Sequence, residues 1–226
     1  MIRPATILTT LCLLLTFTLS AQRERVNPTP NRASDPRTYL LDLPDSEAAQ
    51  YWDASFPEKN VGFLHVYADP GVVDGEVYSM MGQEIDGIST AMLPKKFQKM
   101  ASRMDADVYA SAAIRGKNEN LYLVRMDGPS EDRVEMFALR SGQVKHLKTL
   151  AHYKKSNSGR VMQTDSWLTD IDGDTHFELM TITRSPSGKE KRSVYMMNDK
   201  RTWVKTKADD APWNSADLFD PATDNE

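Results

Sequence analysis

The second half of the chain alternates apolar and polar residues in short runs separated by turn-forming residues. Alternation with a period of two residues is typical of half-buried β-strands. Pairs such as Asp127-Gly128 and Ser158-Gly159 suit the tight turns that join hairpin strands. The pattern predicts eight strands, at residues 108–114, 121–126, 133–139, 144–153, 161–169, 178–183, 192–197 and 202–207. Consecutive strands with short connections favour antiparallel pairing, so we expect an antiparallel β region over residues 107–207.

Residues 39–106 carry a mixed pattern, which predicts a small α+β section before this β region. Asp45 or Ser46 can cap a short helix that runs through Trp52, because their side-chain oxygens accept backbone N–H groups of the first turn. Pro94 stands where a proline opens a helix, and apolar residues follow it at helical spacing. Strands are predicted over residues 61–68 and near residues 76–84. The expected fold is therefore mainly β with a small N-terminal α+β section.

The β region contains a weak internal repeat, which would divide it into tandem four-stranded units. The shift of 58 residues that places Leu121 on Leu179 also places Val124 on Ile182. Each copy would be an antiparallel, blade-like sheet of the kind found in β-propellers. Two copies cannot close a ring, so such units would pack against each other or against the N-terminal section. The alternative is a chance alignment of two β-meanders, because strand patterns are degenerate.

Residues 1–21 have the three zones of a cleavable secretory signal peptide. A basic start at Arg3 precedes an apolar run and the small residues Ser20 and Ala21. The run is short for a transmembrane helix, which needs about 20 apolar residues, although an uncleaved anchor is the alternative. We expect a secreted or periplasmic protein with no membrane span after the signal is removed. A proline-containing flexible linker is expected over residues 22–38.

Composition excludes several classes of site and partner. The single cysteine, Cys12, lies in the predicted signal peptide, so the mature chain would hold no disulfide, thiolate metal site or cysteine nucleophile. The formal net charge of -4 provides no basic surface for nucleic acid, and we expect no nucleic-acid partner. Residues 208–226 form an acidic tail with six carboxylates and no basic residue.

Four carboxylates fall within nine residues between two predicted strands. Asp170, Asp172, Asp174 and Glu178 occupy positions 1, 3, 5 and 9 of this segment. Calcium binds six to eight oxygen ligands at about 2.3 to 2.6 Å, and the carbonyl of His176 could supply a further one. Without a cation, these carboxylates would repel one another. The spacing predicts a calcium-binding loop, and the alternative is a solvated acidic turn.

The same residues resemble the calcium loop of FG-GAP and VCBS-type repeats, whose pattern is D-x-D-x-D-G-x-x-D. Asp170, Asp172 and Asp174 match the three loop aspartates, and Glu178 stands at the last acidic position. Thr175 departs from the pattern, because the family usually has glycine there. The resemblance covers this loop and its flanking strands. It implies a calcium-stabilised loop in a module that binds a protein or glycan ligand.

The sequence supports one main function hypothesis and leaves two others open. We expect a secreted or periplasmic, non-enzymatic β-rich protein with one structural calcium loop, serving as a ligand- or surface-binding module. The alternative is an envelope hydrolase with a carboxylate-lined cleft, marked by two carboxylates with raised pKa values away from the calcium loop. A third hypothesis is an assembly subunit. No catalytic residue is predicted, because the H-E-x-x-H and G-x-S-x-G patterns are absent from the sequence.

Overall fold

The computed structural model describes five parts of the chain, namely residues 45–59, 63–69, 82–116, 119–170 and 176–206. Several sequence predictions fall outside them. These are the signal peptide (1–21), the linker (22–38), the acidic tail (208–226), most of the strand near 76–84, and the calcium ligands Asp172 and Asp174.

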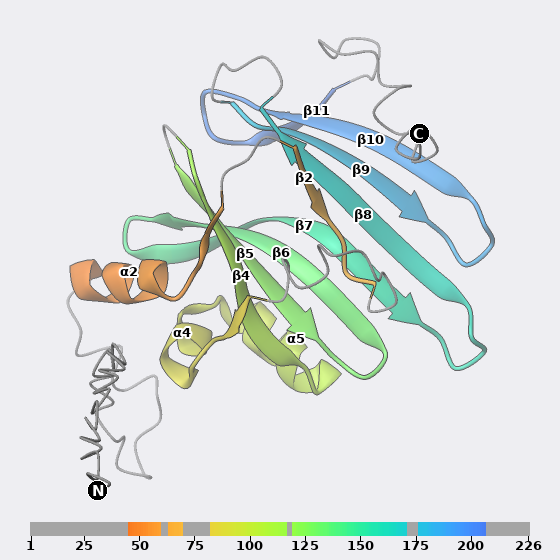
Figure 1. Cartoon of the computed structure of the whole chain (residues 1–226), viewed down its shortest axis with the longest axis horizontal. Helices are drawn as coiled ribbons and strands as arrows, with labels where there is room; N and C mark the ends of the chain where they lie inside the picture. The colour runs from red at the N-terminus through yellow and green to blue at the C-terminus, as the bar shows by residue number, and fades with distance from the viewer. Residues whose placement is uncertain (1–44, 60–62, 70–81, 117–118, 171–175, 207–226) are drawn as a thin grey trace, which may run out of the picture. The chain divides into compact units, whose positions relative to one another are not determined.

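An antiparallel meander of eight strands dominates the described chain, and each strand lies within two residues of its predicted bounds (Figure 1). The strands are β4 (Asp107–Arg115), β5 (Asn120–Asp127), β6 (Glu131–Arg140), β7 (Gln143–Lys155), β8 (Val161–Thr169), β9 (Glu178–Arg184), β10 (Glu190–Met197) and β11 (Trp203–Thr206). The prediction of a mainly β fold is confirmed.

Three short strands complete an 11-stranded sheet. They are β1 (Glu58–Lys59), β2 (Phe63–Val66) and β3 (Gln83–Glu84). β1 pairs with β4 in parallel, which makes the sheet mixed, while β3 pairs with β4 and β2 pairs with β8 in antiparallel fashion. The predicted blade-like repeat is not seen, because β4 to β11 follow one another in one open sheet instead of forming two separate blades.

The two halves of this sheet diverge between β7 and β8. β6 and β7 pair along nearly their whole length, with two irregularities in register. β7 and β8 pair only where His152–Lys155 meets Val161–Thr164. Beyond that point β2 takes the free edge of β8. Strand β2 is therefore held by a partner about a hundred residues further along the chain.

Three helices belong to the described N-terminal section: α2 (Asp45–Ala54), α4 (Gly87–Met92) and α5 (Lys95–Met104). The helices predicted from Asp45 and after Pro94 are confirmed. The sequence did not predict α4. Asp86 caps this helix, because its side chain accepts the N–H of Ser89 at 2.8 Å. None of the helices in the described ranges is long and apolar enough to cross a membrane.

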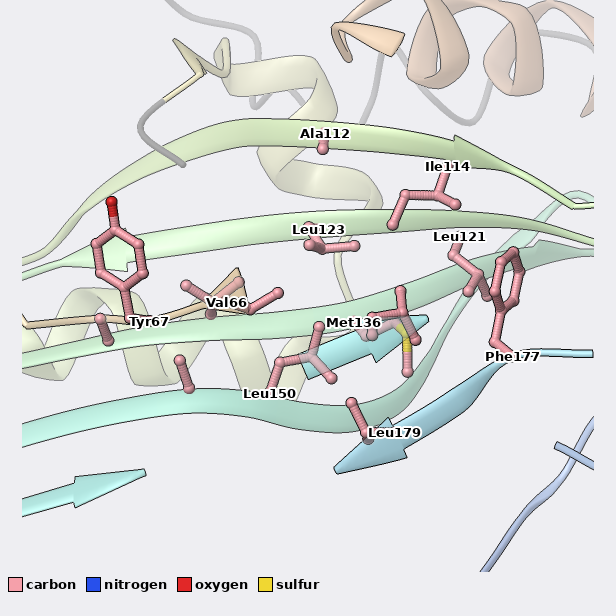
Figure 2. Close-up of a cluster of buried hydrophobic side chains, with 14 residues drawn as sticks. Val66, Tyr67, Ala112, Ile114, Leu121, Leu123, Met136, Leu150, Phe177 and Leu179 are labelled. Atoms are coloured by element: carbon pink, nitrogen blue, oxygen red, sulfur yellow. The ribbon is translucent and has the colours of Figure 1, made fainter. Parts of the chain in front are cut away.

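Two large hydrophobic cores lie on opposite faces of β4 to β6. The first joins the helices to the sheet. Its largest buried side chains are Trp52, Tyr122 and Phe137. The second joins β4 to β7 with β2, β8 and β9, and Figure 2 shows its side chains converging from these strands. On β5, Leu121 and Leu123 enter the second core while Tyr122 enters the first. This strand is therefore buried on both faces, as its nearly continuous apolar run requires.

A third, smaller cluster lies on the other face of β9 and β10. Met180, Ile182 and Val194 form it, with Trp167 packed against them. Successive strand residues point to opposite faces, so Met180 faces away from its neighbour Leu179, which belongs to the second core.

Candidate functional site

The predicted calcium loop connects β8 and β9 at one end of the sheet, which we call the loop end. β4, β6, β8 and β10 all run toward this end, because neighbouring strands of the meander are antiparallel. The connections that leave these four strands begin at residues 116, 141, 170 and 198. Contacts between their described residues hold these connections together, since Gly116 lies against Phe177 and Arg140 binds the carbonyl of Arg201.

Three of the five predicted calcium ligands are described by the structure. Asp170 directly follows β8, and Glu178 is the first residue of β9, opposite Thr169. The hairpin therefore brings the first and last predicted ligands to the same end of the sheet. Glu178 is only 1% exposed. Among the described residues, no group of three or more His, Cys, Asp or Glu side chains is arranged to hold a metal ion.

The C-terminal flank of the loop is anchored on both sides. The carbonyl of Phe177 accepts the N–H of Met197 at 3.1 Å, which ties it to the end of β10. The Nε2 atom of His176 lies 3.5 Å from Oδ1 of Asp199. Gly116 lets the β4–β5 connection approach, because a Cβ there would lie 3.1 Å from the Phe177 ring and 2.5 Å from the carbonyl oxygen of Glu119. The flank is thus fixed by two neighbouring connections.

An acid pair lies at the opposite end of the sheet. Asp127 and Asp132 face each other across β5 and β6. Burial of Asp132, which is 3% exposed, together with its hydrogen bond to Asp127 and the charge of Asp127, raises the pKa of Asp132 to about 7. Its Oδ1 accepts the N–H of Gly128 at 3.0 Å. Arg125, also buried, places Nη2 3.2 Å from Oδ1 of Asp127 and 3.3 Å from the carbonyl of Ala68.

This pair bears on the hydrolase hypothesis, which expects two carboxylates with raised pKa values in one cleft. The pKa of Asp132 is raised, as this hypothesis expects, and Asp132 lies at the end of the sheet opposite the predicted calcium loop. Its carboxyl group, however, is buried. We interpret Asp132 as a buried carboxylic acid that keeps its proton and hydrogen-bonds to Asp127.

Replacing Asp132 with asparagine is expected to stabilise the protein at pH 8 by about 1 to 3 kcal/mol. The pKa of Asp132 is higher in the folded than in the unfolded chain, so the wild-type protein loses stability as the pH rises from about 4 to about 7. The amide can still accept the N–H of Gly128, and it donates to Asp127 without ionising. Urea unfolding at pH 8 and pH 5 measures the effect.

The gain should be smaller at pH 5 than at pH 8, because the folded wild-type protein still holds the proton at pH 5 and has lost less of its stability there. Asp199→Asn serves as the control, because its side chain is 97% exposed and its loss should change stability by less than about 0.5 kcal/mol at either pH. A stabilisation of equal size at pH 5 and pH 8 would contradict the raised pKa of Asp132.

A polar ladder runs along β6 and β7. Glu135 is 0% exposed and accepts three hydrogen bonds, from Nε of Arg133 (2.7 Å), Nε2 of His146 (2.8 Å) and Oγ1 of Thr149 (2.8 Å). Burial alone would raise the pKa of Glu135, but these hydrogen bonds and the charge of Arg133 outweigh it and lower the pKa. Arg133 also binds Glu131, at 3.2 Å.

Glu131 continues the ladder with two further partners. It accepts hydrogen bonds from Nε2 of His152 at 3.0 Å and from Nζ of Lys154 at 2.8 Å. The ladder has histidine beside carboxylate, a pairing found in general acid–base sites. The ring of His146, however, packs between Phe97 and Phe137, with centroids at 4.5 and 5.5 Å. We therefore interpret the ladder as structural.

Sequence reasoning missed both polar clusters. Alternating charged residues on β6 were the available signal, since Glu131, Arg133 and Glu135 share one face of a strand. Their partners on β7 depend on two register irregularities, which the sequence does not reveal. The predicted calcium loop thus keeps its described flanks at the loop end, and the two missed clusters make internal contacts.

Comparison of the chain with models of known protein families, with curated proteins and with solved structures found no match.

Proposed function

We propose that this is an exported, non-enzymatic, β-rich protein in which the connection between β8 and β9 binds one calcium ion. The observation that carries the proposal is the spacing of four carboxylates in nine residues, at Asp170, Asp172, Asp174 and Glu178. Export is proposed from the tripartite pattern of residues 1–21. The module would present the ordered loop to a protein or glycan ligand.

The described flanks of the loop support this proposal. Asp170 and Glu178 stand at the two ends of one hairpin connection, so their carboxylates start from neighbouring strands. Glu178 is buried and Asp170 is half-buried. Attraction between a carboxylate and a cation is stronger in such surroundings than in water, because the effective dielectric constant is lower.

The proposed ligands are all hard oxygens, as calcium prefers. They are the carboxylates of Asp170, Asp172, Asp174 and Glu178 and the main-chain carbonyl of His176. Water would complete the six to eight oxygens that calcium takes. The ion would cancel repulsion among the carboxylates and fix the loop between its anchored flank and β8.

Calcium is expected to raise the melting temperature by about 5 to 10 °C relative to the chelated protein. Ligand at about one hundred times its Kd adds about 2.7 kcal/mol to the stability of the folded state, and a domain of this size gains about 2 to 4 °C per kcal/mol. The measurement is calorimetric melting of the full chain in EGTA and in increasing free calcium, with magnesium as a competing cation.

Asp172→Asn and Asp174→Asn should abolish the calcium-dependent shift. Asp105→Asn is the matched control, because it removes one carboxylate at the opposite end of the sheet, where its φ of 51° suits asparagine. The control should keep the full shift. Identical melting curves of the wild-type protein in calcium and in EGTA would remove the metal from the proposed function.

A further inference from the structure

A cavity of about 460 Å³ opens at the loop end between two hairpins that are far apart in the sequence. The β6–β7 hairpin lines it with Leu139, Arg140 and Ser141, and the β10–β11 hairpin lines it with Asp199, Lys200 and Arg201. Three of these six side chains are cationic. This concentration is unusual in a chain whose formal net charge is -4.

Arg140 is held in place at the edge of the cavity. Its Nε and Nη2 atoms each lie 2.6 Å from a carboxylate oxygen of Glu119, and Nη2 also donates to the carbonyl of Arg201 at 2.9 Å. Glu119 is nearly fully buried, which makes this paired contact rigid. Nη1 of Arg140 has no hydrogen bond to the described residues, so it remains available as a donor.

The turn of the β10–β11 hairpin positions the other two cations. The carbonyl of Asn198 accepts the N–H of Arg201 at 2.7 Å. The side-chain Oδ1 of Asn198 accepts the N–H of Thr202 at 3.0 Å. Arg201 itself takes a left-handed conformation, with φ at 57°. Its Nη1 is 4.0 Å from Oε1 of Glu119. Lys200 has no ion-pair partner within the described ranges.

The nearby carboxylates leave positive charge in the cavity. Glu119 is committed to Arg140 through two short hydrogen bonds. Asp199 contacts His176, which is not one of the six lining residues: its Oδ1 lies 3.5 Å from Nε2 of His176. Glu119 and Asp199 together balance two of the three cationic side chains, so one positive charge remains at the cavity. Guanidinium and ammonium donors that converge in this way suit phosphate, sulfate or carboxylate oxygens.

We propose that this cavity binds the oxyanion group of a small ligand, with Arg140, Lys200 and Arg201 as donors. Its volume falls in the range of small-molecule sites, about 300 to 1,000 Å³, so the ligand can extend beyond the anion itself. Leu139 and Ser141 also line the cavity, and neither carries a charge. The proposal does not depend on calcium binding.

Titration with glucose 6-phosphate tests this site, with glucose as the uncharged comparison. The full chain is titrated in EGTA at constant ionic strength, and binding is followed by calorimetry and by backbone amide shifts. We expect saturable binding of the phosphorylated sugar, shifts at residues 139–141 and 199–201, and no binding of glucose. Absence of saturable binding, or equal binding of both sugars, would overturn the proposal.

Charge variants separate the cavity from general electrostatic attraction. The double change Lys200→Gln and Arg201→Gln should weaken binding by about tenfold or more, because two of three donors lose their charge. Lys189→Gln with Lys191→Gln is the matched control, since it removes the same charge at the β9–β10 hairpin, at the opposite end of the sheet. Equal weakening in the two double variants would show that net charge, not the cavity, attracts the ligand.

Discussion

Replacing Trp52 with alanine is expected to lower the free energy of unfolding by about 3 to 5 kcal/mol. Trp52 is 0% exposed and attaches α2 to the face of β4 to β6. Its ring centroid lies 4.8 Å from that of Phe56 and 5.9 Å from that of Tyr122. Alanine would lose these contacts and leave a cavity that the rigid sheet cannot fill. Urea unfolding followed by circular dichroism measures the loss.

Trp52→Phe is the matched variant, because it keeps an aromatic ring in the same place. The indole Nε1 of Trp52 is buried and has no hydrogen-bond partner among the described residues, so phenylalanine also removes a donor that these residues leave unsatisfied. We expect this change to cost less than about 1.5 kcal/mol. If phenylalanine cost as much as alanine, packing of the ring could not be what attaches α2.

The alternating pattern predicted the meander well because side-chain burial alone specifies it. Strands β4 to β10 each contain buried residues, and their apolar positions, alternating or continuous, mark the strands in the sequence. The pairing of β2 with β8 was not predictable in the same way. A strand shows in its sequence that one side is buried, but not which distant strand forms its edge partner.

Helix α4 shows a second limit of sequence reasoning. Its segment, GISTAM, begins with glycine and contains two residues that compete with helix formation, so propensity argued against it. The cap at Asp86 and the burial of Ser89 stabilise the turn in the folded protein. The strand β1 was missed because its two residues, Glu58 and Lys59, carry no pattern and are held by parallel pairing with β4.

The candidate sites were predictable only where the chemistry lies within one loop. The carboxylates from Asp170 to Glu178 form a local pattern, and with Asp172 and Asp174 outside the described residues their calcium site stays a prediction. The cavity at Arg140 and Arg201 joins hairpins 61 residues apart, so no local pattern reports it. The same holds for any site built by tertiary packing.

Replacing Glu135 with alanine is expected to cost about 3 to 4 kcal/mol at pH 7. The carboxylate is 0% exposed, and its removal leaves Arg133, His146 and Thr149 each without one hydrogen-bond acceptor. Breaking a buried charged contact costs more than the contact contributes, because the remaining partner groups stay desolvated. Guanidinium unfolding of the wild-type and variant proteins over a range of pH measures the difference.

Two features distinguish the ladder from an ordinary surface ion pair. Glu190→Ala, the control, removes a more exposed carboxylate that binds Arg192 and Arg184, and it should cost at most about 1 kcal/mol. The pKa of Glu135 is lowered in the folded state, so its contribution is present above the unfolded value of about 4.3 and disappears as the pH falls through the folded value. The cost of Glu135→Ala should therefore shrink in acid. A cost that stays constant down to pH 2 would mean that the side chain acts through packing instead of through its charge.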